Sequence, residues 1–174
     1  MDQLTVVDGA LGLLLAIAVG TDLKYQKIFN KLTFPAMLIG ACYWVLQGQV
    51  GFGLLGIAVG FGMTFPAFAL GRTLRAGDAK LMMAVGALVG PGMVFRACLL
   101  MYLLSIPFGL GVLAYKGRLG NLIPALKAGV QSAAGQQEEG APPVPVTVVA
   151  YAPVIAVAVA VARFTDWLDF WGGA

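Results

Sequence analysis

The stretch GFGLLGIAVGFGMTFPAFALG, residues 51–71, contains 21 residues and no charged side chain. An α-helix needs about 20 apolar residues to cross the roughly 30 Å hydrocarbon core of a bilayer, so this stretch is long enough for one crossing. The sequence therefore predicts an all-α membrane protein, with about six transmembrane helices in a single domain, residues 1–174. The other apolar runs on which this count depends are 4–21, 32–48, 79–95, 97–115 and 146–164.

The composition agrees with this fold class. Of the 174 residues, 60% are hydrophobic and 11% are charged, and the mean hydropathy is +0.89. A soluble domain carries roughly a quarter of its residues as charged side chains, which cover its surface. The 24 glycines are spread through the apolar runs, as is common in lipid-embedded helices. The composition therefore excludes an ordinary soluble protein.

Two pairs of glycines stand four residues apart inside the apolar runs, Gly56 with Gly60 and Gly86 with Gly90. In membrane helices such pairs allow two backbones to approach closely. We interpret both pairs as packing positions and expect no chemistry from them.

Basic residues are unevenly divided between the two sides of the predicted bundle. With six crossings, nine of the eleven Lys and Arg residues fall on one side, and only Arg96 and Arg163 fall on the other. Cytoplasmic loops carry the excess of basic residues, so we predict that the nine face the cytosol and that both termini lie on the outer side. The nine are Lys24, Lys27, Lys31, Arg72, Arg75, Lys80, Lys116, Arg118 and Lys127.

The connection at about 116–145 is predicted to be a flexible cytosolic loop with two parts. Residues 121–130 alternate apolar and small side chains, and we expect a short helix there in the membrane interface. Residues 131–145 are polar and rich in proline, which is typical of a flexible tether.

The chain contains no histidine and two isolated cysteines, Cys42 and Cys98, each inside an apolar run. An ordinary zinc site and a Ser-His or Cys-His nucleophile are therefore excluded. We expect neither a metal nor a cofactor.

Two aspartates, Asp22 and Asp78, are the only acidic residues at the predicted cytosolic boundary, and each lies beside a helix end. One interpretation is structural, with Asp78 as a helix N-cap and Asp22 paired with Lys24 or Lys27. The other is catalytic, because two carboxyl groups that share one proton can activate water. The ionised group then acts as the base, and the protonated group polarises the scissile carbonyl. Spacing alone leaves both interpretations open.

The two helix ends predict which carboxyl group carries the proton. Asp22 closes its helix, where the helix dipole is negative and disfavours a carboxylate. Asp78 opens its helix, where free N–H groups and the positive end of the dipole favour an anion. We therefore expect Asp78 to be ionised and Asp22 to be protonated.

Two sequence blocks resemble the motifs of the type IV prepilin peptidases, a family of membrane aspartyl peptidases. The block TDLKYQKIFNKLT, residues 21–33, is similar to their Asp, basic stretch and Ile-Pro-Asn, with Phe29 where the family has proline. The block RAGDAKL, residues 75–81, is similar to their GxGD motif followed by x-Lys-Leu, with Arg75 where the family has its first glycine. Helix order, block spacing and the late Tyr151-Ala152-Pro153 extend the resemblance over nearly the whole chain.

The resemblance implies a function and assigns residues to it. Asp22 and Asp78 would be the catalytic pair, and Asn30, Gly77 and Lys80 would support them as motif residues. The substrate would be a membrane-inserted prepilin (Flp) or pseudopilin precursor whose short basic leader is removed at the cytosolic face of the bacterial inner membrane. The chain looks like the short form found with tight-adherence (Flp) pili, which lacks the cysteine-containing domain, so cleavage without N-methylation is expected. The implied partners are the precursor and membrane lipid, with no nucleic acid.

Two other function classes remain open at this point. A small transporter is one, although the predicted helix centres contain essentially no ionisable residue, whereas transport sites are built from polar groups near the midplane of the bilayer. A non-catalytic component of a pilus or secretion assembly is the other, and cleavage of a prepilin distinguishes it from the peptidase.

Overall fold

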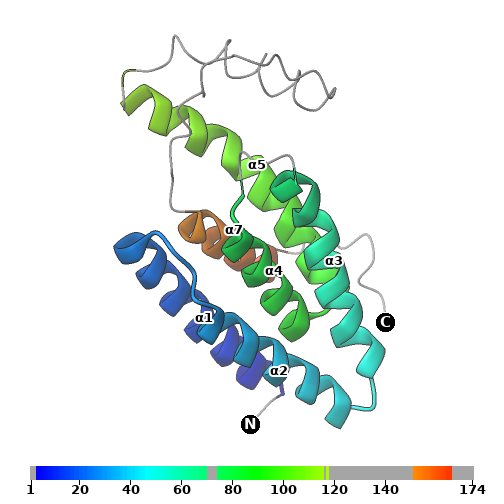
Figure 1. The fold of residues 1–174 in the computed structure, drawn as a ribbon. Coiled ribbons are helices and arrows are strands. Elements are labelled where there is room, and N and C mark those ends of the chain that lie inside the picture. Colours follow the sequence, from blue (N-terminus) through cyan, green and yellow to red (C-terminus); the bar gives the residue numbers. More distant parts are fainter. Residues whose placement is uncertain (1–2, 70–73, 116, 118–150, 166–174) are drawn as a thin grey trace.

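All regular structure in the described residues is helical. The computed structural model describes residues 3–69, 74–115, 117 and 151–165. Within them, the predicted apolar runs are helical apart from the turn at Gly90, and the fold class is confirmed as all-α (Figure 1). The helices are α1 (Gln3–Tyr25), α2 (Asn30–Leu46), α3 (Val50–Ala69), α4 (Ala76–Val89), α5 (Pro91–Tyr115) and α7 (Ala152–Phe164). The connection predicted as an interfacial helix at 121–130 and a tether at 131–145 lies outside the described residues.

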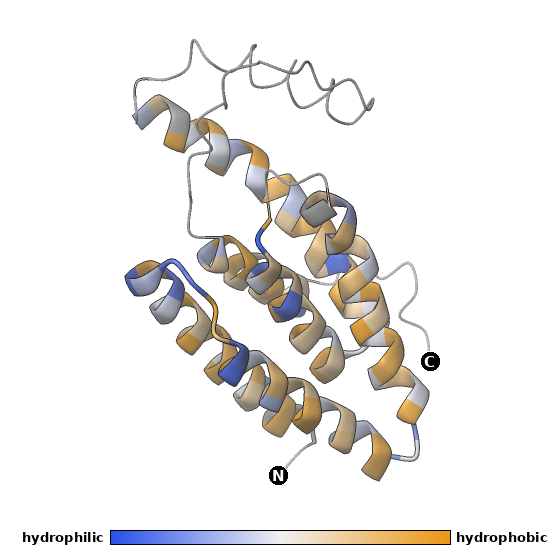
Figure 2. Cartoon of the chain, in the orientation of Figure 1, coloured by the Kyte–Doolittle hydropathy of each residue, from blue (hydrophilic) through white to orange (hydrophobic). Residues whose placement is uncertain are grey.

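Three of these helices are long and apolar enough to cross a membrane, and the chain is a membrane protein. The candidate spans are Val6–Tyr25 in α1, Val50–Ala67 in α3 and Pro91–Val112 in α5, and α7 is a shorter apolar helix. Figure 2 shows hydrophobic colour along the helices and hydrophilic colour where α1 passes into α2 and where α4 begins. The six predicted crossings are thus supported in part, by three long helices and one shorter one.

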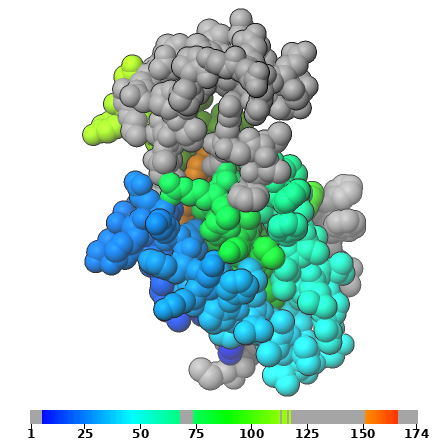
Figure 3. Space-filling model, in the orientation of Figure 1, coloured from blue at the N-terminus to red at the C-terminus, as the bar shows by residue number. Residues whose placement is uncertain are grey.

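Helix α4 forms the centre of the bundle. It packs mainly against α3 and α2, and to a lesser extent against α5 and α1. In the space-filling view its green atoms lie between those of α2 and α3 (Figure 3). Its 14 residues measure about 21 Å at 1.5 Å per residue, less than the thickness of the hydrocarbon core. The helix is buried on nearly every side, through Asp78, Ala79, Leu81, Met82, Ala84, Val85, Gly86, Ala87 and Leu88.

The outer helices present large apolar side chains on their exposed faces. Protein surfaces in water rarely carry such an extended apolar patch, whereas in a bilayer the same side chains face lipid. On α3 and α5 these exposed residues include Leu54, Leu55, Phe61, Phe65, Leu103 and Ile106.

Glycines allow α3 to approach α4 closely. A Cβ atom added to Gly56 would overlap the carbonyl oxygen of Gly86, and a Cβ on Gly86 would overlap the carbonyl of Gly56. One turn further along α3, a Cβ on Gly60 would lie 2.6 Å from the carbonyl oxygen of Met82. The prediction that these glycines are packing positions is confirmed at all three sites.

The boundary between the fourth and fifth helices was predicted wrongly. The sequence placed the turn near Arg96, but α4 ends at Val89, and α5 already begins at Pro91. Gly90 has φ +82°, and a Cβ there would overlap the ring of Phe52, so only glycine fits this turn. Pro91 then takes the first position of α5, where the missing N–H costs no hydrogen bond.

We predict that Gly56→Ala destabilises the protein and that Gly62→Ala on the same helix does not. The new methyl group at position 56 meets backbone atoms of α4 that have no freedom to move aside. Position 62 opens onto empty space, and alanine there gains up to about 1 kcal/mol of helix propensity. Thermal unfolding in detergent measures both variants. Equal melting temperatures for the two variants would contradict the close contact between α3 and α4.

Candidate active site

Asp22 lies near the end of α1 with its side chain buried, at 3% relative exposure. Its Oδ2 atom accepts a hydrogen bond of 2.9 Å from the backbone N–H of Ala152, the first residue of α7. The residues are 130 positions apart in the chain. The partner of Asp22 is therefore a helix start contributed by the far end of the sequence, not the lysines that follow it.

Asp78 lies in the first turn of α4 and is equally buried, at 3% exposure. Its Oδ2 atom accepts a 2.9 Å hydrogen bond from the backbone N–H of Arg75, the N-cap residue. Asp78 is thus not the N-cap itself. It reaches back from the third helical position, as the acidic residue of a capping box does.

The two carboxyl groups lie close enough to influence each other. Burial raises the pKa of Asp78 to about 6, and the negative charge of Asp22 contributes to that rise. The hydrogen bond from the Arg75 N–H and the positive charge of Arg75 act in the opposite direction. The structure therefore brings together the two aspartates that the sequence singled out, and burial raises the pKa of one of them.

Asp22 has a neighbour beyond its own helix. It lies at the negative end of α1, but it also faces the positive end of α7 and receives an N–H from it. A donor and a positive helix end both favour negative charge. Desolvation opposes negative charge at Asp78. The location of the shared proton, expected on Asp22, stays a prediction.

The two motif blocks, residues 21–33 and 75–81, lie side by side and are in contact at three points. The Arg75 guanidinium donates a hydrogen bond to the carbonyl of Gln26. A Cβ on Gly77 would lie 3.1 Å from the Cβ of Ile28, so this glycine permits the close approach.

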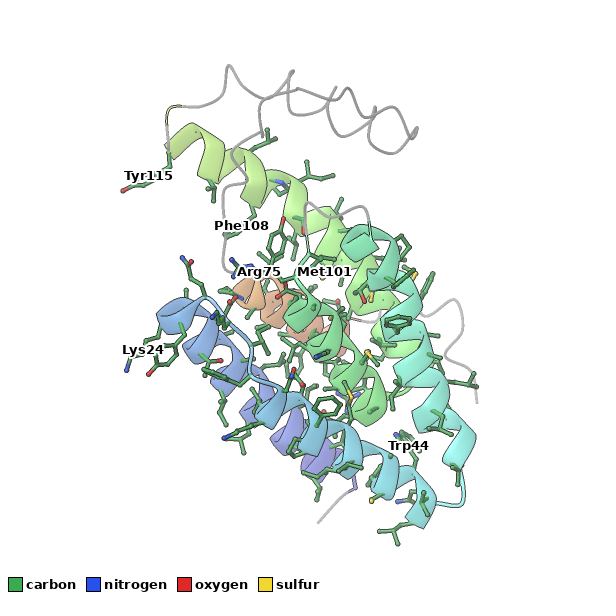
Figure 4. All side chains as sticks on the ribbon, viewed as in Figure 1. Lys24, Trp44, Arg75, Met101, Phe108 and Tyr115 are labelled. Carbon is green, nitrogen blue, oxygen red and sulfur yellow. The ribbon has the colours of Figure 1, made fainter. Side chains whose placement is uncertain are left out.

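The third contact between the blocks comes from two of the supporting motif residues. The Lys80 ammonium donates a 2.9 Å hydrogen bond to Asn30 Oδ1. The three supporting motif residues all lie where the α1–α2 connection and the start of α2 contact α4: Gly77, Asn30 and Lys80. In the side-chain view, Arg75 lies at the start of α4, toward the same end of the bundle as Lys24 (Figure 4).

Both departures from the family motif are compatible with the local backbone. Arg75 has φ −90° and ψ 158°, an extended conformation that every residue type adopts. Phe29 precedes α2 with φ −79° and ψ 135°, within the range that a proline at this position would impose. Neither position requires the residue that the motif contains.

The start of α7 is the part of the site that the side-chain motifs did not identify. Tyr151 immediately precedes the helix, and its pKa is raised by burial and by the negative charge of Asp78. Ala152 contributes only a backbone N–H. The available signals were the resemblance of Tyr151-Ala152-Pro153 to the family and the position of Pro153 in the first turn, because proline there marks a helix start.

The described residues contain no group of three or more histidine, cysteine or acidic side chains that could hold a metal ion. The chemistry open to this site is that of two carboxyl groups with two backbone donors. One carboxylate takes a proton from water while the other group donates one.

Comparison with known protein families gives a match. Residues 9–113, more than half of the 174-residue chain, match the type IV leader peptidase family. No curated protein and no solved structure matches the chain. The matched region includes both aspartates and ends before α7.

We predict that the infrared band of a protonated carboxyl group titrates with a midpoint near pH 6 and disappears in Asp78→Asn. In Asp22→Asn the band remains but its midpoint falls, because the negative charge that helps to raise the pKa of Asp78 is gone. Protein labelled with ¹³C-aspartate, titrated in detergent, provides the measurement. A band lost in Asp22→Asn and kept in Asp78→Asn would contradict this prediction and support the distribution expected from the helix ends alone.

Proposed function

Because the chain belongs to the type IV leader peptidase family, we propose that it is a membrane aspartyl endopeptidase for prepilin or pseudopilin precursors. Membership of the family implies cleavage of a prepilin leader peptide. The observation that carries the proposal is the burial of Asp22 and Asp78 beside each other, each bound to a backbone N–H. We assign these two residues as the catalytic pair.

The surroundings of the two carboxyl groups support distinct roles for them. Asp22, held by the Ala152 N–H, takes a proton from a water molecule as the general base. The water oxygen attacks the scissile carbonyl carbon while Asp78 gives its proton to the carbonyl oxygen. In the tetrahedral intermediate the C–N bond then breaks, and the leaving amine takes the proton held by Asp22. The proton on the new hydroxyl group returns to Asp78, which restores the starting state.

The arrangement of the helix ends supports a site at one membrane face. Lys24, Arg75 and Tyr115 lie toward one end of the bundle, and Trp44 lies toward the other (Figure 4). With the basic end in the cytosol, all six described helices would lie in the membrane, the short α4 being shielded from lipid by its neighbours. A precursor whose scissile bond lies just inside the cytosolic boundary of the membrane could then approach the site laterally through the bilayer. Its own transmembrane helix would pack on the exposed apolar faces of the outer helices.

Cleavage of a prepilin by the purified protein tests the proposal. We expect the wild type to release the leader, and Asp22→Ala and Asp78→Ala each to lower the rate by at least about 10³-fold, as loss of a residue from a catalytic unit does. Mass spectrometry of a prepilin from the same genome, in lipid or detergent, follows the product. Its mass also tests whether the new N-terminus is left unmethylated, as the resemblance to the short form implies.

Asp8→Asn is the matched control for this experiment. Asp8 belongs to the same helix as Asp22, but it pairs with Arg163 at the other end of α1 and α7, with Nε to Oδ1 at 2.7 Å. Such a half-exposed pair contributes up to about 1 kcal/mol of stability, so cleavage should persist. Cleavage that survives both alanine substitutions excludes the dyad. A wild type that retains its fold and leaves several prepilins intact favours the non-catalytic assembly component.

The orientation gives a separate prediction. In a Cys42→Ser background, a cysteine at position 24 should react with a membrane-impermeant maleimide only after the cells are permeabilised. A cysteine at position 47, in the α2–α3 connection, should react in spheroplasts. Both positions are exposed, and the remaining Cys98 is fully buried. Labelling of both cysteines from the same side would contradict a membrane-spanning α2.

A further inference from the structure

Arg75 connects the two segments that carry the aspartates. Its backbone N–H donates to Asp78 Oδ2 at 2.9 Å, and its guanidinium donates to the carbonyl oxygen of Gln26. Gln26 in turn donates its own N–H to the carbonyl oxygen of Asp22 at 2.8 Å. Three consecutive hydrogen bonds thus run from the carboxyl group of Asp78 to the backbone of Asp22, and Arg75 is the only side chain that takes part as a donor.

The backbone at Gln26 is held in a conformation that its sequence does not favour. Gln26 has φ +51°, the only positive φ of a non-glycine residue in the described part of the chain. A left-handed conformation costs such a residue roughly 1–2 kcal/mol, so it persists only where its surroundings hold it. The bond from Arg75 to the Gln26 carbonyl is one such restraint, and the close approach of Ile28 to Gly77 is another.

Arg75 also brings positive charge to Asp78 from the solvent side, since its side chain is exposed. Among the residues that the structure describes, the other titratable groups around Asp78 are Asp22 on α1, Tyr151 before α7 and Lys80 on α4, whose ammonium is bound to Asn30. Lys31 is at the exposed start of α2, α3 has no charged residue, and Arg96 is in the second turn of α5, beside the far end of α4.

We propose that Arg75 is a positioning residue that holds the α1–α2 connection against the start of α4 and thereby sets both the separation and the charge balance of Asp22 and Asp78. The expected effect of Arg75 on the cleavage rate rests on the proposed peptidase function. Its expected effect on the carboxyl group of Asp78 rests on geometry alone. In agreement with this role, the positive charge of Arg75 is among the influences that lower the pKa of Asp78.

Arg75→Gln and Arg75→Lys separate the two parts of this role. The glutamine variant keeps the backbone N–H but removes the charge, and the lysine variant keeps the charge and a single donor. Lys27→Gln is the matched control, because it removes a positive charge from an exposed residue next to Gln26. For each variant we would record the infrared titration of ¹³C-labelled aspartate and the pH dependence of prepilin cleavage, at low and at high salt.

We expect Arg75→Gln to move the titration midpoint of the Asp78 carboxyl group upward by about 0.5 pH unit at low salt, because the positive charge that lowers its pKa is lost. The shift is modest because the guanidinium is exposed. Cleavage near pH 7 should fall by about tenfold, mainly in kcat, because a small misplacement of catalytic groups reduces the rate steeply. Arg75→Lys should keep the wild-type midpoint with a partial loss of rate. High salt screens the charge of the exposed guanidinium, so it should also move the wild-type midpoint upward.

The outcomes separate this inference from the proposed function. An unchanged midpoint in Arg75→Gln, or a shift no larger than that of Lys27→Gln, overturns the role of Arg75 even if the wild type cleaves prepilin. A rate loss with no change in midpoint reduces Arg75 to an ordinary structural residue. Failure of the wild type to cleave refutes the peptidase, while the midpoints still decide the role of Arg75. If Arg75→Gln does not fold, the salt dependence of the wild-type midpoint decides it.

Discussion

The structure depends on keeping two carboxyl groups buried together inside an apolar bundle. Desolvation disfavours the charged form of a buried carboxyl group, and the proximity of a second one adds to that cost. The fold offsets this cost with backbone donors from two helix starts, the N–H of Arg75 before α4 and the N–H of Ala152 at the start of α7. The end of α1 therefore has to meet the beginnings of α4 and α7, and this requirement explains why segments so far apart in the chain converge.

The sequence was sufficient to predict the helices because each apolar run is long and nearly free of charge. The sequence was not sufficient to place the boundary at Gly90, because Pro91 is compatible with the end of one helix and with the start of the next. The contact that decides between them is the ring of Phe52 against Gly90. That contact is tertiary, between residues 38 positions apart, and no local pattern contains it.

The same distinction applies to the site. Asp22 and Asp78 were identifiable because acidic side chains are rare at the ends of apolar helices and because two motifs surround them. The donors that hold them were not identifiable, since a backbone N–H is present at every residue except proline and leaves no mark in the sequence. The location of the shared proton stays a prediction for the same reason. It was based on the ends of the helices that carry the aspartates and did not include the N–H that the start of α7 donates to Asp22.

Helix α3 contributes no charged residue and no polar contact to the two aspartates, yet it determines where one of them lies. Its glycines at positions 56 and 60 allow the backbone of α4 to approach as closely as the carbonyl groups permit. Because α4 is a short, rigid helix buried on nearly every side, this contact fixes its position along the bundle, and with it the depth of Asp78 at its first turn. A larger residue on the α3 side of this interface would overlap the backbone of α4, and close-packed interiors have few voids to absorb such a change. The position of the Asp78 carboxyl group is therefore determined partly by contacts about one and two turns further along α4, at Met82 and Gly86, with glycines that have no chemistry of their own.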